Sequence, residues 1–173
     1  MYRLIKPLLE HKKDATLYIE ELLSYKSAIH GTGFLDKYLE SSSYEEWLSE
    51  IEILENNSDD DKVPCSTYFL VDGFNNIIGM TNIRHTLNDK LFFHGGHIGY
   101  SIRPLERGKG YGKLILSLAL LKCKELGIDK VLITAEDNNV PSYKTIEALG
   151  GVLENKVNDK GKVFRRYFIN LED

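Results

Sequence analysis

Long apolar runs, paired cysteines and an excess of basic residues are all absent from this sequence of 173 residues. No stretch approaches the roughly 18 uninterrupted apolar residues of a membrane-spanning helix, and the opening Met1–Pro7 is interrupted too soon for a signal peptide. Cys65 and Cys123 lie far apart without the spacing of metal ligands. The sequence therefore predicts a protein of the reducing cytoplasm, neither secreted nor membrane-spanning, with no metal site.

The charge balance excludes another class of function. Lys and Arg number 22 against 26 Asp and Glu, a formal net charge of −4, whereas a dedicated nucleic-acid-binding protein carries a basic stripe or patch. Tyr68, Phe69, Phe92 and Phe93 are therefore predicted to belong to the core or to line a cleft rather than to stack on bases. The acidic run Asp59–Asp61 is interpreted as a solvated loop.

The composition that is present, 42% hydrophobic and 28% charged, is typical of a soluble domain. Alternating and helical apolar patterns follow one another along the chain, so we predict a single mixed α/β (α+β) domain over residues 1–173. The patterns predict strands at 2–6, 67–72, 77–84, 97–103, 130–135 and 162–171, and helices at 8–25, 44–54, 112–126 and 141–149. The forty residues that follow Tyr25 are expected to be helical and polar.

Three glycines alternate in Glu106-Arg-Gly-Lys-Gly-Tyr-Gly-Lys113, between a predicted strand that stops at Pro104 and a predicted apolar helix. A helix N-terminus presents unpaired backbone N–H groups and a favourable dipole to an anion, and glycine allows a close approach. Arg107, Lys109 and Lys113 add positive charge. The stretch therefore predicts a site for a pyrophosphate.

Two well-known phosphate-binding motifs do not match this loop. It is not a Walker loop, because Gly-x-x-x-x-Gly-Lys-[Ser/Thr] is absent, and its glycines do not match the dinucleotide fingerprint Gly-x-Gly-x-x-Gly. The glycines could instead serve only a tight connection. A nucleotide-binding switch is a further alternative, which predicts affinity for ATP or GTP comparable to that for coenzyme A.

The motif Arg107-Gly-Lys-Gly-Tyr-Gly112 resembles the Arg/Gln-x-x-Gly-x-Gly/Ala signature of the GNAT N-acetyltransferase superfamily, which binds the pyrophosphate of acetyl-coenzyme A there. Gly96-His-Ile-Gly-Tyr-Ser-Ile-Arg-Pro104 is similar to a branch of small predicted acetyltransferases, and the resemblance covers roughly residues 65–170. It implies the GNAT fold: a mixed, twisted central sheet with helices on both faces, splayed open between two parallel strands where acetyl-coenzyme A enters.

The resemblance also implies which residues bind this cosubstrate. The strand before the loop supplies a backbone N–H for the developing oxyanion, and an asparagine after the next strand contacts the pantetheine arm. Carried onto this chain, the binding set is Ile102, Arg107, Gly108, Lys109, Gly110, Tyr111, Gly112, Lys113, Asn139 and Ser142.

A base is needed because the attacking amine must lose a proton. Relatives carry their base near the start of the strand before the loop, where this chain has His97, and an imidazole suits neutral pH. His97 could equally be a structural histidine satisfied by a loop or a sheet neighbour. His94 is the reserve candidate, and His85 ranks below it.

An acid is expected for the departing thiolate. Many relatives use a tyrosine seven residues after the asparagine, but here that position holds Ile146. Tyr143, one helical turn earlier, is the candidate acid, although it could instead pack or contact the cosubstrate. Water could also protonate the thiolate.

The resulting hypothesis is an acetyl-coenzyme A-dependent N-acetyltransferase that transfers the acetyl group directly to a primary amine. The alternative is a GNAT-fold coenzyme A-binding or regulatory protein with little turnover. Residues 65–171 form the predicted core, and residues 1–60, with the 84–94 loop, are expected to shape the acceptor site. The acceptor is a small molecule or peptide of unassigned identity, and a homodimer is the default assembly.

Overall fold

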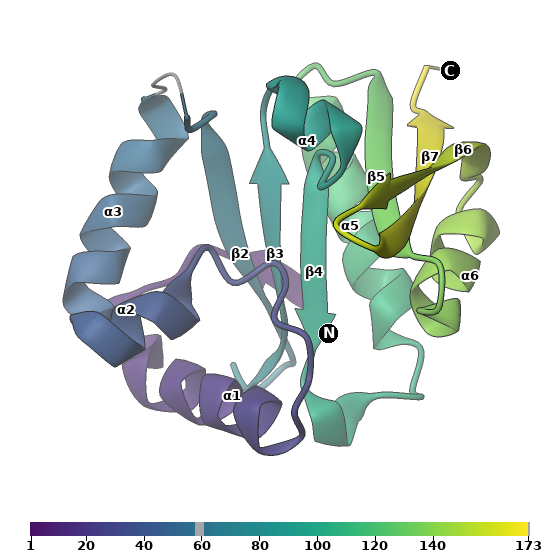
Figure 1. Cartoon of the computed structure of the whole chain (residues 1–173). Helices are drawn as coiled ribbons and strands as arrows, with labels where there is room; N and C mark the ends of the chain where they lie inside the picture. Colours follow the sequence, from purple (N-terminus) through teal and green to yellow (C-terminus); the bar gives the residue numbers. More distant parts are fainter. Residues whose placement is uncertain (58–60, 173) are drawn as a thin grey trace.

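Seven strands form two antiparallel sheets in the computed structural model, which describes residues 1–57 and 61–172 (Figure 1). The first sheet has the strand order β1-β2-β3-β4 and the second has the order β5-β7-β6. The strands are β1 (Arg3–Ile5), β2 (Cys65–Val71), β3 (Ile77–Arg84), β4 (Ile98–Ile102), β5 (Lys130–Glu136), β6 (Val152–Asp159) and β7 (Lys162–Asn170).

Helices cover both faces of the first sheet. Phe69 of β2 and Met80 of β3 pack against α1, α2 and α3, whereas Leu70, one residue along β2, packs against α5 on the other face. This alternation follows from the two-residue period of a strand. The helices are η1 (Leu9–His11), α1 (Lys12–Ser24), α2 (Leu35–Ser41), α3 (Tyr44–Asn56), α4 (Asp89–Phe93), η2 (Pro104–Glu106), α5 (Tyr111–Glu125) and α6 (Val140–Ala148).

Local signals account for several helix ends. The Ser43 hydroxyl accepts a hydrogen bond from the Glu46 amide at 3.1 Å, as the capping-box spacing predicts. Gly127 follows α5 with a φ of +75°, the left-handed conformation that glycine commonly adopts at the end of a helix. None of the described helices is both long and apolar enough to cross a membrane.

Three segments differ from the sequence expectations. Strand β6 had not been predicted, because most of its residues are exposed and only its pairing with β7 makes it a strand. Helix α4 lies within the expected 84–94 loop, and residues 27–34, expected to be helical, form an irregular segment. Asp59 and Asp60 of the expected acidic loop lie outside the described residues.

The two sheets meet between β4 and β5, which run in the same direction because α5 connects them across one face (Figure 1). At the start of β4, the His97 amide donates to the Leu132 carbonyl at 2.8 Å. No ladder joins the two strands beyond this point, since β5 pairs with β7 and β4 pairs with β3. This seam is the splayed arrangement that the resemblance implied, and the predicted fold class is confirmed.

Candidate active site

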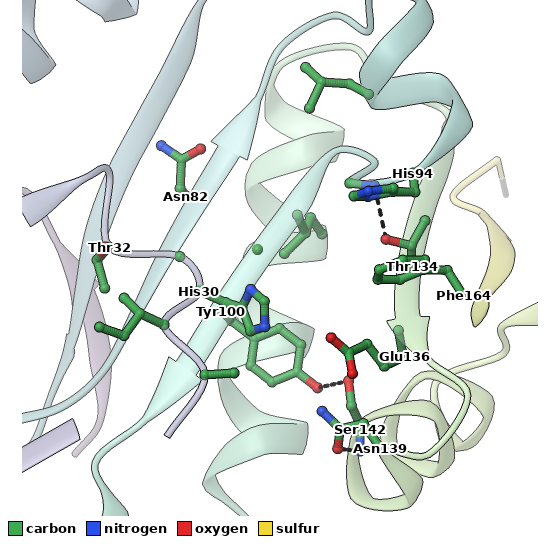
Figure 2. Close-up of a pocket in the computed structure, with 18 of the residues that line it drawn as sticks. His30, Thr32, Asn82, His94, Tyr100, Thr134, Glu136, Asn139, Ser142 and Phe164 are labelled. Carbon is green, nitrogen blue, oxygen red and sulfur yellow. Dashed lines mark hydrogen bonds between the residues drawn. The ribbon is translucent and has the colours of Figure 1, made fainter. Parts of the chain in front are cut away.

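A cavity of about 800 Å³ occupies the seam between β4 and β5. Its walls come from the 28–37 segment, the end of β3, α4, the end of β5 and the start of α6 (Figure 2). Tyr100 of β4 and Glu136 of β5 line it from the two sides of the seam, and Asn139 and Ser142 line it from α6. The seam therefore encloses polar side chains from both sheets.

The glycine loop lies after the C-terminal end of β4, at the N-terminus of α5. Gly108 and Gly110 adopt left-handed conformations, with φ of +75° and +85°, and a Cβ at either would meet no atom within 4 Å. None of the amides from Gly108 to Lys113 donates a hydrogen bond to an acceptor in the part of the chain that the structure describes. The loop is thus a row of unpaired donors beside open space, as an anion site requires.

The cations of this loop differ in their surroundings. Arg107 Nε donates to the Ile102 carbonyl at 3.2 Å, which fixes the guanidinium against the end of β4. Lys109 Nζ lies 2.9 Å from a carboxylate oxygen of Glu106, whereas the exposed Lys113 has no such partner among the described residues. Arg107 and Lys113 therefore offer more net positive charge than Lys109.

The edge of β4 that faces β5 presents further donors. The Arg103 amide donates to the Ile78 carbonyl, and the Arg84 amide donates to the His97 carbonyl. Both bonds join the segment that contains β4 to β3, so every second residue between them, 97, 99, 101 and 103, has its backbone bonds directed toward β3. Because an antiparallel strand alternates its bonding edge, the amides of Tyr100 and Ile102 face the seam. Of these two, Tyr100 lines the cavity.

The start of α6 and Tyr100 come together across the seam. The Asn139 side chain caps α6 by accepting from the Ser142 amide at 3.3 Å. The Tyr100 hydroxyl lies 3.4 Å from the Ser142 hydroxyl, as Figure 2 shows. Burial raises the pKa of the Tyr100 phenol, so the phenol stays protonated at neutral pH.

His97 lies outside the cavity lining and joins the two sheets. Its Nδ1 accepts from the Leu132 amide at 2.9 Å, while its own amide donates to the Leu132 carbonyl. Burial, with the nearby Arg84 cation, lowers the pKa of His97 to about 4. A buried, neutral imidazole with this bonding serves the structure of the seam.

Tyr143 also lies outside the cavity lining. Its ring is covered by the Arg165 guanidinium at 3.8 Å, and it packs with the core between α6 and the second sheet. Ile146 is fully buried in the same core. The structure therefore brings Asn139 and Ser142 to the cavity but leaves Tyr143 and His97 outside it.

The other two histidines considered from the sequence have separate partners. His94 lines the cavity and stacks on Phe164, with its Nε2 2.8 Å from a carboxylate oxygen of Asp159. His85 Nε2 lies 2.8 Å from the Ser66 hydroxyl, outside the cavity lining.

His30 and Arg84 lie in segments that the sequence analysis expected to shape the acceptor site, but it assigned no individual role to either residue. His30 stands in Ala28-Ile-His-Gly-Thr-Gly33, where glycines at 31 and 33 were a signal of irregular backbone. His30 and Tyr100 both line the cavity, and both are labelled in Figure 2. Burial lowers the pKa of His30, Glu136 opposes this, and Arg84 and Lys162 lower it further.

An open seam between two sheets, with unpaired amides at a helix N-terminus beyond it, is the arrangement expected of a protein that binds an anionic cosubstrate. A family model described as an acetyltransferase (GNAT) domain matches residues 4–152. The chain belongs to this family of acetyltransferases, whose members use acetyl-coenzyme A, so the resemblance is confirmed. Comparison with curated proteins finds none that matches.

Solved structures share the fold at low identity. A ribosomal-protein-S5-alanine acetyltransferase from Vibrio fischeri is 19% identical, with a TM-score of 0.67 and 99% of this chain and 93% of that chain covered. A dodecameric spermidine N-acetyltransferase from Vibrio cholerae is 17% identical (TM-score 0.62, 99% and 93% covered). The protein yncA from Salmonella typhimurium, solved with its cofactor acetyl-CoA, is 14% identical (TM-score 0.63, 99% and 95% covered).

Proposed function

We propose that this protein transfers the acetyl group of acetyl-coenzyme A directly to a primary amine that enters the cavity between β4 and β5. The observation that carries the proposal is the row of six amides, Gly108 to Lys113, at the start of α5, which have no hydrogen-bond acceptor among the described residues. These amides fit a pyrophosphate, and Arg107 and Lys113 would add charge–charge attraction to it. The names of the spermidine and ribosomal-protein-alanine acetyltransferases among the similar structures support an amine as acceptor.

Other residues of the predicted binding set would hold the rest of the cosubstrate. The Asn139 amide nitrogen and the Ser142 hydroxyl line the cavity at the start of α6, within reach of a chain that runs along β4. Acetyl-coenzyme A supplies the acetyl group as a thioester. The Tyr100 amide faces the seam at the cavity, so we assign the oxyanion donor to Tyr100, with the Ile102 amide nearer the glycine loop.

His30 is our candidate base. An ammonium with a pKa near 10.4 costs about 4.6 kcal/mol to deprotonate at pH 7, so a neutral imidazole in the cavity lowers the barrier. The depressed pKa keeps His30 neutral at pH 7, and the Glu136 carboxylate stabilises the imidazolium that forms when His30 takes the proton. His97 is not retained in this role, because its Nδ1 is bonded to the Leu132 amide and it lies outside the cavity.

Tyr100 is our candidate acid. Its phenol is protonated, lines the cavity and lies near the Ser142 hydroxyl. In the transfer a C–N bond forms and the C–S bond breaks. Tyr100 Oη gives its proton to the departing sulfur, and His30 holds the proton taken from the amine. Tyr143 packs under Arg165, so a smaller contribution is expected from it.

The test is thiol release from acetyl-coenzyme A with a broad panel of primary amines. Removing a group that transfers a proton should lower kcat by about a hundredfold or more in Tyr100→Phe and in His30→Gln. Tyr143→Phe is the matched control and should lose less than about threefold. The acid limb of kcat/KM should lie below pH 6.5, because the pKa of His30 is lowered.

Binding of acetyl-coenzyme A without thiol release across the whole panel would favour the coenzyme A-binding, regulatory alternative. An equal loss in Tyr143→Phe and Tyr100→Phe would contradict the assignment of the acid.

A further inference from the structure

Arg84 is a cation in the cavity that has no carboxylate partner within residues 1–57 and 61–172. It is the last residue of β3, and its side chain lines the cavity wall. No described Asp or Glu forms an ion pair with it. Because an enclosed charge is costly unless it is paired, such a guanidinium favours an anion from outside the chain.

Only part of the guanidinium is used by the fold. Nη1 donates to the carbonyls of Gly95 and Gly96, both at 3.1 Å, which holds the side chain in one position. Nη2 donates to none of the described residues and lies beside Gly99, where a built Cβ would approach it to 3.6 Å. Gly99 also lines the cavity. The geometry leaves a fixed donor at the cavity wall.

The remaining charges of the cavity do not form an acidic site. Of its two carboxylates, Glu136 is paired with Lys162 at 3.1 Å and Asp36 accepts from the Thr32 hydroxyl at 3.2 Å. Lys37 and Lys90 add two exposed cations at the rim. A polycation such as spermidine would be repelled by Arg84, and among the described residues Asp36 is the one carboxylate of the cavity lining without a cationic partner.

We propose that Arg84 determines acceptor specificity by binding a carboxylate of the acceptor, which is therefore a small aminocarboxylate with a primary amine and a free carboxylate in one molecule. The inference rests on the proposed function, because it concerns the acceptor of the same transfer. A guanidinium matches a carboxylate with charge-assisted hydrogen bonds, and one already fixed by two carbonyls loses little entropy on binding.

The experiment compares acids with their neutral amides. Glycine and glycinamide, leucine and leucinamide, and β-alanine and β-alaninamide, with spermidine, are assayed for kcat/KM by thiol release. Wild type should prefer each acid by about tenfold or more. The preference should disappear in Arg84→Gln. It should be intermediate in Arg84→Lys, because lysine keeps the positive charge but lacks the paired N–H donors of the guanidinium. Lys90→Gln, which removes an exposed cation of the same cavity, should change the preference by less than about threefold.

A second readout does not need turnover. N-acetylleucine and N-acetylleucinamide are titrated by calorimetry into protein saturated with coenzyme A. Wild type should bind the acid about tenfold more tightly, and Arg84→Gln should bind both alike. A purely structural role of Arg84 at Gly95 and Gly96 would change stability but not this ratio.

The outcomes separate the two proposals. No thiol release with any amine contradicts the proposed function, and the calorimetric ratio still decides the role of Arg84. Equal treatment of acid and amide by wild type, or a preference that survives in Arg84→Gln, overturns the inference. If Arg84→Gln does not fold, the acid-to-amide ratio of wild type and its decrease in Arg84→Lys test the role of Arg84 instead.

Discussion

The two ends of the seam between β4 and β5 are built differently. At the N-terminal end of β4, His97 and Leu132 exchange two hydrogen bonds, so the polar groups that face the seam have partners within the protein. At the other end, the amides from Gly108 to Lys113 have no acceptor among the described residues, and two left-handed glycines face open space.

One end of the seam therefore serves the structure, and the other end has the properties of a ligand site. Buried polar groups that are satisfied by the chain hold the two sheets together. Polar groups that converge without partners mark where a ligand completes the bonding. The cavity lies between these ends, and its unpaired Arg84 belongs with the second kind.

The largest effect should come from protonation of His97, at the N-terminal end of β4, where the seam is closed by hydrogen bonds between the sheets. The pKa of His97 is about 4 in the folded chain and near 6.5 in an unfolded chain. Below pH 6.5 the unfolded chain binds more protons, so stability falls as the pH falls toward 4, by about 3 kcal/mol from this residue. Above pH 6.5 His97 is neutral in both states and adds no pH dependence.

Urea unfolding of wild type and His97→Gln between pH 4 and 7 measures this term. The glutamine can still accept from the Leu132 amide but does not titrate. Between pH 7 and 4 the stability of this variant should therefore fall by about 3 kcal/mol less than that of wild type. Parallel pH profiles would show that His97 does not join the sheets as a neutral imidazole.

A smaller effect is expected from Gly110→Ala in the glycine loop, which forms the open end of the seam. A Cβ on Gly110 enters the space beside the unpaired amides, so coenzyme A affinity should fall about tenfold or more, ~1.4 kcal/mol. Gly127→Ala is the matched control, because Gly127 ends the same helix with a φ of +75° and no atom near its Cβ. Both variants should lose about 1–2 kcal/mol of stability from left-handed strain. Equal coenzyme A affinity in the two, measured by calorimetry, would count against the anion site.

The smallest effect concerns the loop cations. Lys113→Met should weaken coenzyme A binding up to about fivefold, because Lys113 lies in the first turn of α5 and no described carboxylate pairs with it. Lys109→Met should weaken it less, since Glu106 already neutralises Lys109. Both losses should shrink at high salt. A larger loss in Lys109→Met would reverse this ranking.

The open end could be predicted from the sequence because its signals are local. Glycines, cations and a helix start occur within Glu106–Lys113, and Asn139 caps α6 three residues before Ser142. The strand and helix order of the core was predicted for the same reason, whereas β6 had no apolar pattern of its own.

The cavity residues could not be found in this way. His30, Arg84 and Tyr100 come from the irregular 27–34 segment, β3 and β4, and only the packing of these segments brings them to one cavity. His97 is the opposite case, a residue that the sequence suggested for the site. Its position in the strand order suggested a base, but in the structure its imidazole is bonded to Leu132 of the neighbouring sheet.

Amide chemical shifts of the glycine loop test the central claim most directly. ¹⁵N-labelled protein is titrated with coenzyme A and, separately, with pantetheine, which lacks the diphosphate. We predict that saturation with coenzyme A moves the amide resonances of Gly108 to Lys113 strongly and that pantetheine leaves them almost unchanged. Loop amides that do not respond to coenzyme A, or that respond equally to both compounds, would contradict the account.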